Sequence, residues 1–305
     1  MITLGFVYVL AGLTFALFAV LGLLDRSNPK RFGNGIFWGL LALSMLAGDN
    51  LGDFGNGCLV LALVAIAGTG QIGRAPGSDV APDVQAARAA QHGPFLLLVA
   101  LIIPAVALAG TFLFKWVPGL ADPKQATLIS LAIGVLIALA VGMARLKPPL
   151  LLPAQQGRRL LDAVGWAAIL PQMLASLGAV FALAGVGEVV GDLIGTTIPE
   201  GSLFGATLAF GLGMALFTMV MGNAFAAFPV MLAAVGMPLL IEQYGGDPAV
   251  VAAIGTLMTP MAANFNLVPA ALLELKNPYG VIKAQIGTAV PLLAVNIVFI
   301  WLFAF

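Results

Sequence analysis

Long uncharged runs of apolar residues, separated by short polar stretches, dominate the pattern along the chain. A run of about 20 apolar residues suffices for a helix that crosses a bilayer. Such runs cover residues 2–24, 32–48, 54–73, 95–114, 126–144, 163–187, 203–241, 248–273 and 284–305. The run at 203–241 is long enough for two segments. Taken together, the runs predict an all-α, polytopic integral membrane protein. We expect about nine or ten membrane segments, including discontinuous or re-entrant helices.

Composition supports this prediction and narrows the possible functions. The 305 residues are 61% hydrophobic and 9% charged, with a mean hydropathy of +1.08. We expect a single transmembrane domain over residues 1–305. Net charge is zero, which gives no indication of a nucleic-acid partner. The lone cysteine and lone histidine, and the lack of a Ser-His-Asp set, predict neither an enzyme nor a resident metal or cofactor.

The distribution of lysine and arginine predicts the orientation in the membrane. If residues 25–31 face the cytoplasm, the loops that follow alternate between the two sides. Two basic residues then fall outside, Lys115 and Lys124. Eleven fall inside: Arg26, Lys30, Arg31, Arg74, Arg88, Arg145, Lys147, Arg158, Arg159, Lys276 and Lys283. This asymmetry follows the positive-inside rule and places both termini outside a cytoplasmic membrane.

One uncharged run, 248–273, is interrupted by polar side chains between two prolines. Thr259, Pro260, Asn264 and Asn266 precede Pro269. Prolines disfavour continuous helix, and non-helical backbone at membrane depth survives only when buried in protein or lining a wet cavity. A broken segment of this kind is typical of the solute site of a transporter. The alternative is helix–helix hydrogen bonding, worth only about 1 kcal/mol per contact.

A second candidate for solute binding is Asn223, which follows Gly222 inside the 203–241 run. Each of the two broken regions has an asparagine shortly before a Phe-x-x-x-Pro sequence, at 225–229 and 265–269. Paired discontinuous segments of this kind occur in secondary transporters. The alternatives are a chance similarity and a single interhelical hydrogen bond from Asn223.

A glycine-rich polar stretch at 48–57 separates the second and third apolar runs. Its composition favours an external hairpin loop. The other interpretation is a broken membrane element in which Asp49, Asn50 and Asp53 help to hold a coupling cation. We keep both. The basic connector at 145–159 is expected to contact lipid headgroups. Residues 74–93 should form a cytoplasmic loop with a short helix near 84–90, and 188–200 an external loop.

Two stretches carry a resemblance to a known family. The sequence TLMTPMAANFNLVPAALLELKNPYGVIKAQ, beginning at Thr256, and the sequence GDNLGDFGNGCLVLALVAIAGTGQIG, beginning at Gly48, resemble the larger subunit of bacterial two-component 5-oxoproline (pyroglutamate) transporters. The resemblance covers essentially the whole chain. It implies a separately encoded smaller membrane subunit and a relationship to the ion-transporter superfamily, whose solute sites use helical hairpins with Asn, Thr and Pro at their tips.

The residues and the resemblance lead to one functional expectation. We expect secondary active transport of a small carboxylate, 5-oxoproline by resemblance, driven by a Na⁺ or H⁺ gradient. Because no predicted span contains a basic residue, backbone N–H groups at helix N-termini would bind the carboxylate. Two alternatives remain: a cation/proton antiporter that uses Asp49, Asp53 or Asp192, and a membrane subunit that only supports a partner.

Overall fold

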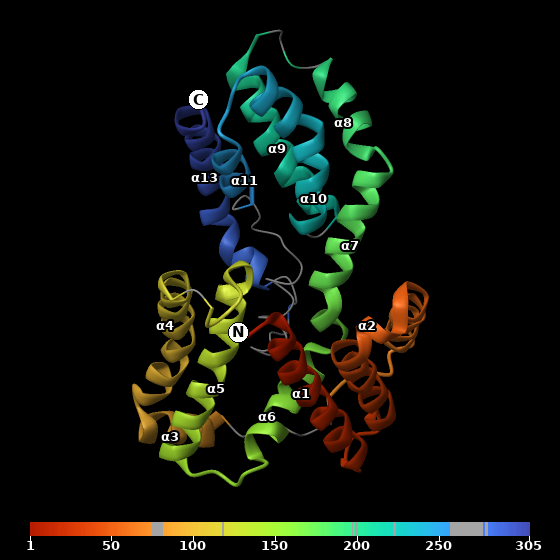
Figure 1. The fold of residues 1–305 in the computed structure, drawn as a ribbon, viewed down its shortest axis with the longest axis vertical. Coiled ribbons are helices and arrows are strands. Elements are labelled where there is room, and N and C mark those ends of the chain that lie inside the picture. The colour runs from red at the N-terminus through yellow and green to blue at the C-terminus, as the bar shows by residue number, and fades with distance from the viewer. Residues whose placement is uncertain are drawn as a thin grey trace. The chain divides into compact units, whose positions relative to one another are not determined.

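The computed structural model describes residues 1–74, 82–117, 119–196, 198, 201–221, 224–256, 277 and 280–305. Most of these residues are helical, and no strand forms among them (Figure 1). Six helices in these ranges are long and apolar enough to cross a membrane, or seven if one bent helix pair is a single span. The chain is therefore an all-α polytopic membrane protein, as predicted.

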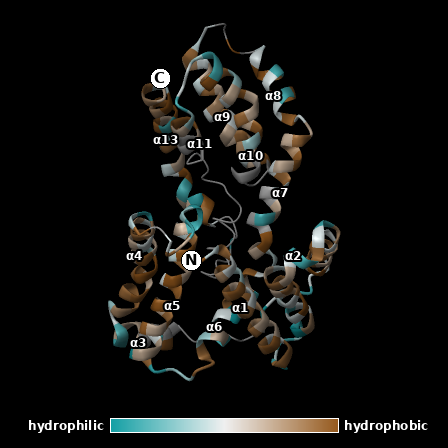
Figure 2. Cartoon of the chain, viewed as in Figure 1, coloured by the Kyte–Doolittle hydropathy of each residue, from teal (hydrophilic) through white to brown (hydrophobic). Residues whose placement is uncertain are grey.

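The chain divides into two compact units, Met1–Gly165 and Trp166–Phe305. The first unit contains α1 (Leu4–Leu24), α2 (Arg31–Gly68), α3 (Pro82–His92), α4 (Phe95–Trp116), η1 (Pro123–Gln125), α5 (Ala126–Leu146) and α6 (Leu152–Val164). Hydrophobic residues run along α1, α4 and α5, as membrane-spanning helices require (Figure 2). The predicted spans at 2–24, 95–114 and 126–144 are thus confirmed as helices, and so is the short helix near 84–90.

Helix α2 is bent into a hairpin at Gly52. The φ and ψ angles of this residue are 62° and 179°, a conformation that glycine alone adopts without strain. The residues after α2 return to its beginning, since a Cβ built on Gly33 would lie 2.1 Å from the carbonyl oxygen of Gln71. The expectation of an external loop at 48–57 is therefore wrong. These residues are helical, and Gly52 is the one residue among them with non-helical φ and ψ angles.

Glycines let the helices of the first unit approach closely. Gly12 of α1 faces Leu46 of α2, while Gly35 of α2 faces Leu23, so α1 and the first arm of α2 are antiparallel. Gly134 of α5 approaches the backbone of α4 in the same way. Small residues at contacts of this kind are the usual basis of helix association in a membrane.

From the boundary onward, most elements are short. They are η2 (Gly165–Ile169), α7 (Leu170–Leu183), α8 (Val186–Gly195), α9 (Leu203–Met221), α10 (Ala224–Met231), η3 (Leu232–Gln243), α11 (Pro248–Thr256) and α13 (Gly280–Phe303). The run at 203–241 does form two segments, because α9 ends at Met221 and a second helical segment begins at Ala224. The last predicted span is confirmed as α13.

Several helices of the second unit share one apolar core. It joins α9, η3, α11 and α13 through buried residues that include Phe210, Met214, Val235, Val251 and Ile300. η3 is a π-helix with a proline inside it, a wider form found mostly as short insertions at irregular or functional positions. The chain end is tied to this core, since the Asp247 N–H donates to the carbonyl of Ala304 (2.8 Å).

The apolar run at 163–187 does not form one straight helix. Residues 176–183 of α7 and 186–195 of α8 meet at an angle of 68°. The break contains Gly185, whose φ of 68° is readily adopted by glycine. Helix α8 also extends across the beginning of the expected external loop at 188–200, so that prediction is wrong up to Gly195.

Candidate functional site

The residues predicted to bind solute lie outside the part of the chain that the structure describes. They are Asn223, Thr259, Pro260, Asn264 and Asn266. The described neighbour is α11, the helix that leads toward the predicted break and ends at Thr256. The prediction that these five residues form a solute site therefore stays a prediction.

The structure places the second set of predicted residues at the bend of α2. Asp49, Asn50 and Asp53 are all exposed and flank Gly52. The bend is stabilised nearby, where Nδ2 of Asn56 donates to the carbonyl of Gly48 (2.9 Å). Among the described residues, no group of three His, Cys, Asp or Glu side chains could hold a metal ion. The side chains at the bend of α2 are thus polar and exposed in the isolated chain, and the role of this bend in cation binding stays a prediction.

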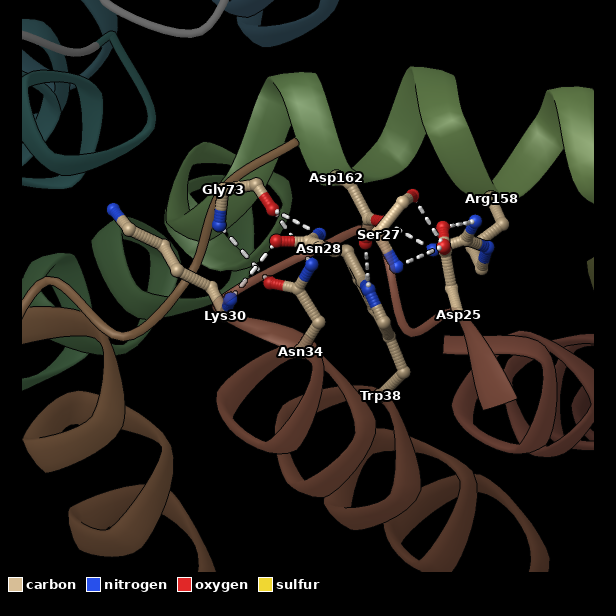
Figure 3. Close-up of polar contacts among 9 residues, drawn as sticks. All are labelled: Asp25, Ser27, Asn28, Lys30, Asn34, Trp38, Gly73, Arg158 and Asp162. Carbon is tan, nitrogen blue, oxygen red and sulfur yellow. Dashed lines mark hydrogen bonds and ion pairs between the residues drawn. The ribbon is translucent and has the colours of Figure 1, made fainter. Parts of the chain in front are cut away.

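Among the residues that the structure describes, the largest group of buried polar side chains lies elsewhere in the first unit. We call it the polar junction; it brings together the end of α1, the first turns of α2, residues 72–73 and α6 (Figure 3). Its members are Asp25, Ser27, Asn28, Lys30, Asn34, Trp38, Gly73, Arg158 and Asp162. Side chains here join three regions that are distant in sequence: residues 25–38, residues 72–73 and α6.

Asn34 and Asn28 close one side of the polar junction. Asn34 pairs with the backbone of Gly73 twice: its Nδ2 donates to the Gly73 carbonyl (2.7 Å), and its Oδ1 accepts from the Gly73 N–H (3.0 Å). Nδ2 of Asn28 donates to the same carbonyl (2.9 Å). Both asparagines are essentially fully buried. These bonds replace water for a non-helical segment and fix the open end of the α2 hairpin.

The other side contains two carboxylates that share one guanidinium. Nη1 of Arg158 donates to Oδ2 of Asp162 (3.0 Å), and Nη2 of Arg158 donates to Oδ2 of Asp25 (2.6 Å). Nε1 of Trp38 donates to Oδ1 of Asp162 (2.8 Å). The side chain of Asp162 is 1% exposed and that of Arg158 6%, whereas that of Asp25 is 19% exposed. Helix α6 is thereby linked to both α1 and α2.

Local sequence explains how each group reaches the polar junction. Arg158 and Asp162 are four residues apart and so lie on one face of α6. Asn34 and Trp38 have the same spacing on α2. Asp25 ends α1, where Ser27 donates its N–H and hydroxyl to Oδ1 of Asp25 in an Asx-type turn. Figure 3 shows the side chains from these separate elements converging.

The two carboxyl groups have opposite electrostatic environments, and both lie outside the candidate membrane spans. Hydrogen bonds from Ser27 lower the pKa of Asp25, with Arg158 acting in the same direction. Burial raises the pKa of Asp162 despite the hydrogen bond from Trp38 and the positive charge of Arg158. Two carboxylates against one guanidinium leave a net negative charge in a place largely closed to water.

The sequence pattern alone does not predict this site. The expected contact of the basic connector at 145–159 with lipid headgroups is wrong for Arg158, because its side chain is buried between two aspartates. The i, i+4 spacing of Arg158 and Asp162 was visible. Their partners were not, since Trp38 and Asp162 are 124 residues apart in sequence.

A further buried polar side chain lies in the second unit. Asn296 of α13 is 8% exposed, and its Nδ2 makes no hydrogen bond among the described residues. Two buried threonines of α9, Thr207 and Thr218, instead donate to carbonyls one turn earlier in their own helix. Asn296 therefore has an unused donor inside an otherwise apolar core.

The fold and the polar junction define a multi-pass α-helical membrane protein with an Asp–Arg–Asp cluster that links α6 to the end of α1 and to α2. The chain belongs to the family described as "Protein of unknown function (DUF979)", whose model matches residues 5–305. No curated protein and no solved structure matches the chain.

Proposed function

We propose that this protein is a secondary active transporter for a small carboxylate, with 5-oxoproline as the substrate that the resemblance indicates. The observation that carries the proposal is the presence of discontinuous helices within apolar segments. Helix α2 reverses at Gly52, and the α7–α8 pair bends by 68° at a glycine-containing break. Interrupted helices expose backbone polar groups, which a membrane protein tolerates only inside protein or beside a water-filled cavity.

The proposed site lies around Asn223, Thr259, Pro260, Asn264 and Asn266. Their amide and hydroxyl groups would bind the lactam, while N–H groups at the ends of broken helices would bind the carboxylate. A smaller membrane subunit would complete the permease. The distribution of basic residues supports a bacterial cytoplasmic (inner) membrane location with both termini outside.

The antiporter alternative receives no specific support. It required Asp49, Asp53 or Asp192 to act as a buried carboxylate, and each of these side chains is exposed in the chain as described. We therefore retain the solute transporter as the proposed function.

Uptake of radiolabelled 5-oxoproline tests this proposal directly. Vesicles containing the full chain with its proposed smaller subunit should accumulate label under a Na⁺ or H⁺ gradient, and Asn264→Ala should abolish uptake without reducing membrane insertion. Asp192→Asn is the matched control and should transport normally. Absence of uptake by the wild-type pair, or normal uptake by Asn264→Ala, would contradict the substrate or the site, respectively.

A further inference from the structure

The polar junction holds a carboxyl group whose surroundings suit a single proton. Asp162 is almost completely buried. Its Oδ1 accepts from Trp38 and its Oδ2 from Arg158, and the side chain of Asn34 also donates toward this carboxyl group. Arg158 is shared with Asp25, so it cannot neutralise both carboxylates. Because a charge in low-dielectric surroundings is unfavourable unless fully paired, the cluster gains by taking up one positive charge.

A proton fits this position better than a metal cation. The donors to Asp162 are N–H groups, and one belongs to a guanidinium whose Nη1 lies 3.0 Å from Oδ2. A Na⁺ ion at Oδ2 would be repelled by Arg158 and would need several further oxygen ligands. A proton needs one lone pair of the carboxylate, which has unused acceptor capacity.

The charged groups around Asp162 are few in the described residues. Its own helix contributes Arg158, and the end of α1 contributes Asp25, while α1 itself carries no charged residue. Helix α2 faces it with the uncharged Trp38 and Asn34. The ammonium of Lys30 is directed to the carbonyl of Ile72 (3.3 Å), away from Asp162 in Figure 3.

Arg74, which follows Gly73, is exposed. Three other arginines, in the turn after α1, at the start of α2 and on α6, have different surroundings. Arg26 is exposed, Arg31 lies over the ring of Phe32 (4.7 Å to its centroid), and Arg159 is half-buried on α6. None of the three has a described hydrogen bond or ion pair to Asp162. The protonation of Asp162 is therefore governed mainly by its burial, with Arg158 and Asp25 as the nearest charges.

The position of α6 gives this protonation a mechanical consequence. Helix α6 ends at Val164, and Gly165, with a φ of 60°, marks the boundary between the two compact units. The Trp38–Asp162 and Asp25–Arg158 contacts are the polar links that hold this last helix against α1 and α2 within the described residues. A change in those links acts on the segment through which the first unit continues into the second.

We propose that Asp162 is the residue that binds the coupling proton of transport, and that this binding loosens α6 from α2; the inference rests on the proposed transport function. A proton from water on the side of the more exposed Asp25 forms an O–H bond at Asp162. Arg158 then pairs with Asp25 alone, and the cluster becomes neutral. The hydrogen bond from Trp38 to an ionised oxygen becomes a bond to a neutral one, which is about half as strong.

Trp38 provides a direct readout that does not depend on transport. A variant with Trp116→Phe, Trp166→Phe and Trp301→Phe keeps Trp38 alone, and the three replaced rings are all substantially exposed. In lipid nanodiscs, its emission should titrate with a midpoint above the ordinary aspartate value of 3.8. Asp162→Asn should remove this transition, and Asp192→Asn should leave it unchanged. A flat titration, or the same transition in Asp162→Asn, would overturn the proposal.

Transport measurements separate coupling from solute binding. With the full chain and its proposed smaller subunit in proteoliposomes, Asp162→Asn should lose at least tenfold of the proton-driven accumulation of labelled 5-oxoproline. It should retain exchange of internal for external 5-oxoproline, which needs no net proton movement. Proton-driven accumulation in Asp162→Asn equal to wild type would refute the proton site while leaving the transporter intact. If the wild type shows neither activity, the transport function fails, and the Trp38 titration still decides whether Asp162 binds a proton.

Discussion

Replacement of Arg158 by methionine is the most informative perturbation of the polar junction. Methionine has a similar length but no charge and no N–H donors, so Asp25 and Asp162 each lose a hydrogen-bonded partner, at 2.6 and 3.0 Å. Asp162, with a side chain 1% exposed, would keep hydrogen bonds only from the uncharged side chains of Trp38 and Asn34. Asp25, 19% exposed, can regain water.

The expected loss of stability follows from the exposed fractions of the two aspartate side chains. Removing one partner of a buried ion pair typically destabilises a protein by about 3–5 kcal/mol. Because Asp25 can rehydrate and Asp162 can take up a proton, we expect a value near the lower end, about 3 kcal/mol. That corresponds to a change of about 150-fold in the unfolding equilibrium. The structure thus predicts a large effect from one side chain outside every candidate membrane span.

The assay is unfolding of the protein in mixed micelles, followed by the loss of helical circular dichroism as denaturant increases. Arg159→Met is the matched control, since it removes a half-buried arginine from the adjacent position of α6. The double variant Arg158→Met/Asp162→Asn should recover more than half of the loss, because no uncompensated carboxylate stays at the buried position. Equal stability of the Arg158→Met and Arg159→Met variants would refute the reasoning, and so would a double variant less stable than Arg158→Met.

Three further predictions concern the same unit. Gly33→Ala would place a Cβ 2.1 Å from a backbone oxygen and should destabilise the protein by about 1–3 kcal/mol in the same unfolding assay. Gly57→Ala, in the same helix, is the control: its Cβ meets open space, so the variant should be as stable as the wild type or more stable. Asn34→Ala should cost about 1–3 kcal/mol and increase proteolysis near Gly73, because it removes both hydrogen bonds to that residue; wild-type protease resistance would contradict this. Since the pKa of Asp25 is lowered on folding, its stabilisation should be present above the ordinary value of 3.8 and disappear as pH falls through the lower folded-state pKa. Asp25→Asn should remove that acid-side dependence, and an unchanged pH profile would disprove it.

The apolar runs of the sequence were sufficient to predict most of the helices. Their length and lack of charge leave few alternatives to membrane-spanning helices, and α1, α4, α5 and α13 follow the predicted limits closely. The prediction failed where a single residue decides the geometry. The stretch at 48–57 has the composition of a loop, yet it is helical on both sides of Gly52. Composition averages over several residues and cannot resolve a one-residue turn.

The polar junction shows most clearly what the tertiary structure alone decided. The sequence by itself determined that this is a helical membrane protein and that Arg158 and Asp162 share a face of their helix. It did not determine whether that face meets water, lipid or protein. Only the packing of α6 against α1 and α2 buries Asp162 beside Trp38 and gives Asp25 and Arg158 a common contact. The protonation chemistry of a carboxyl group depends on such distant neighbours, because burial and nearby charge, not residue type, set its charged state.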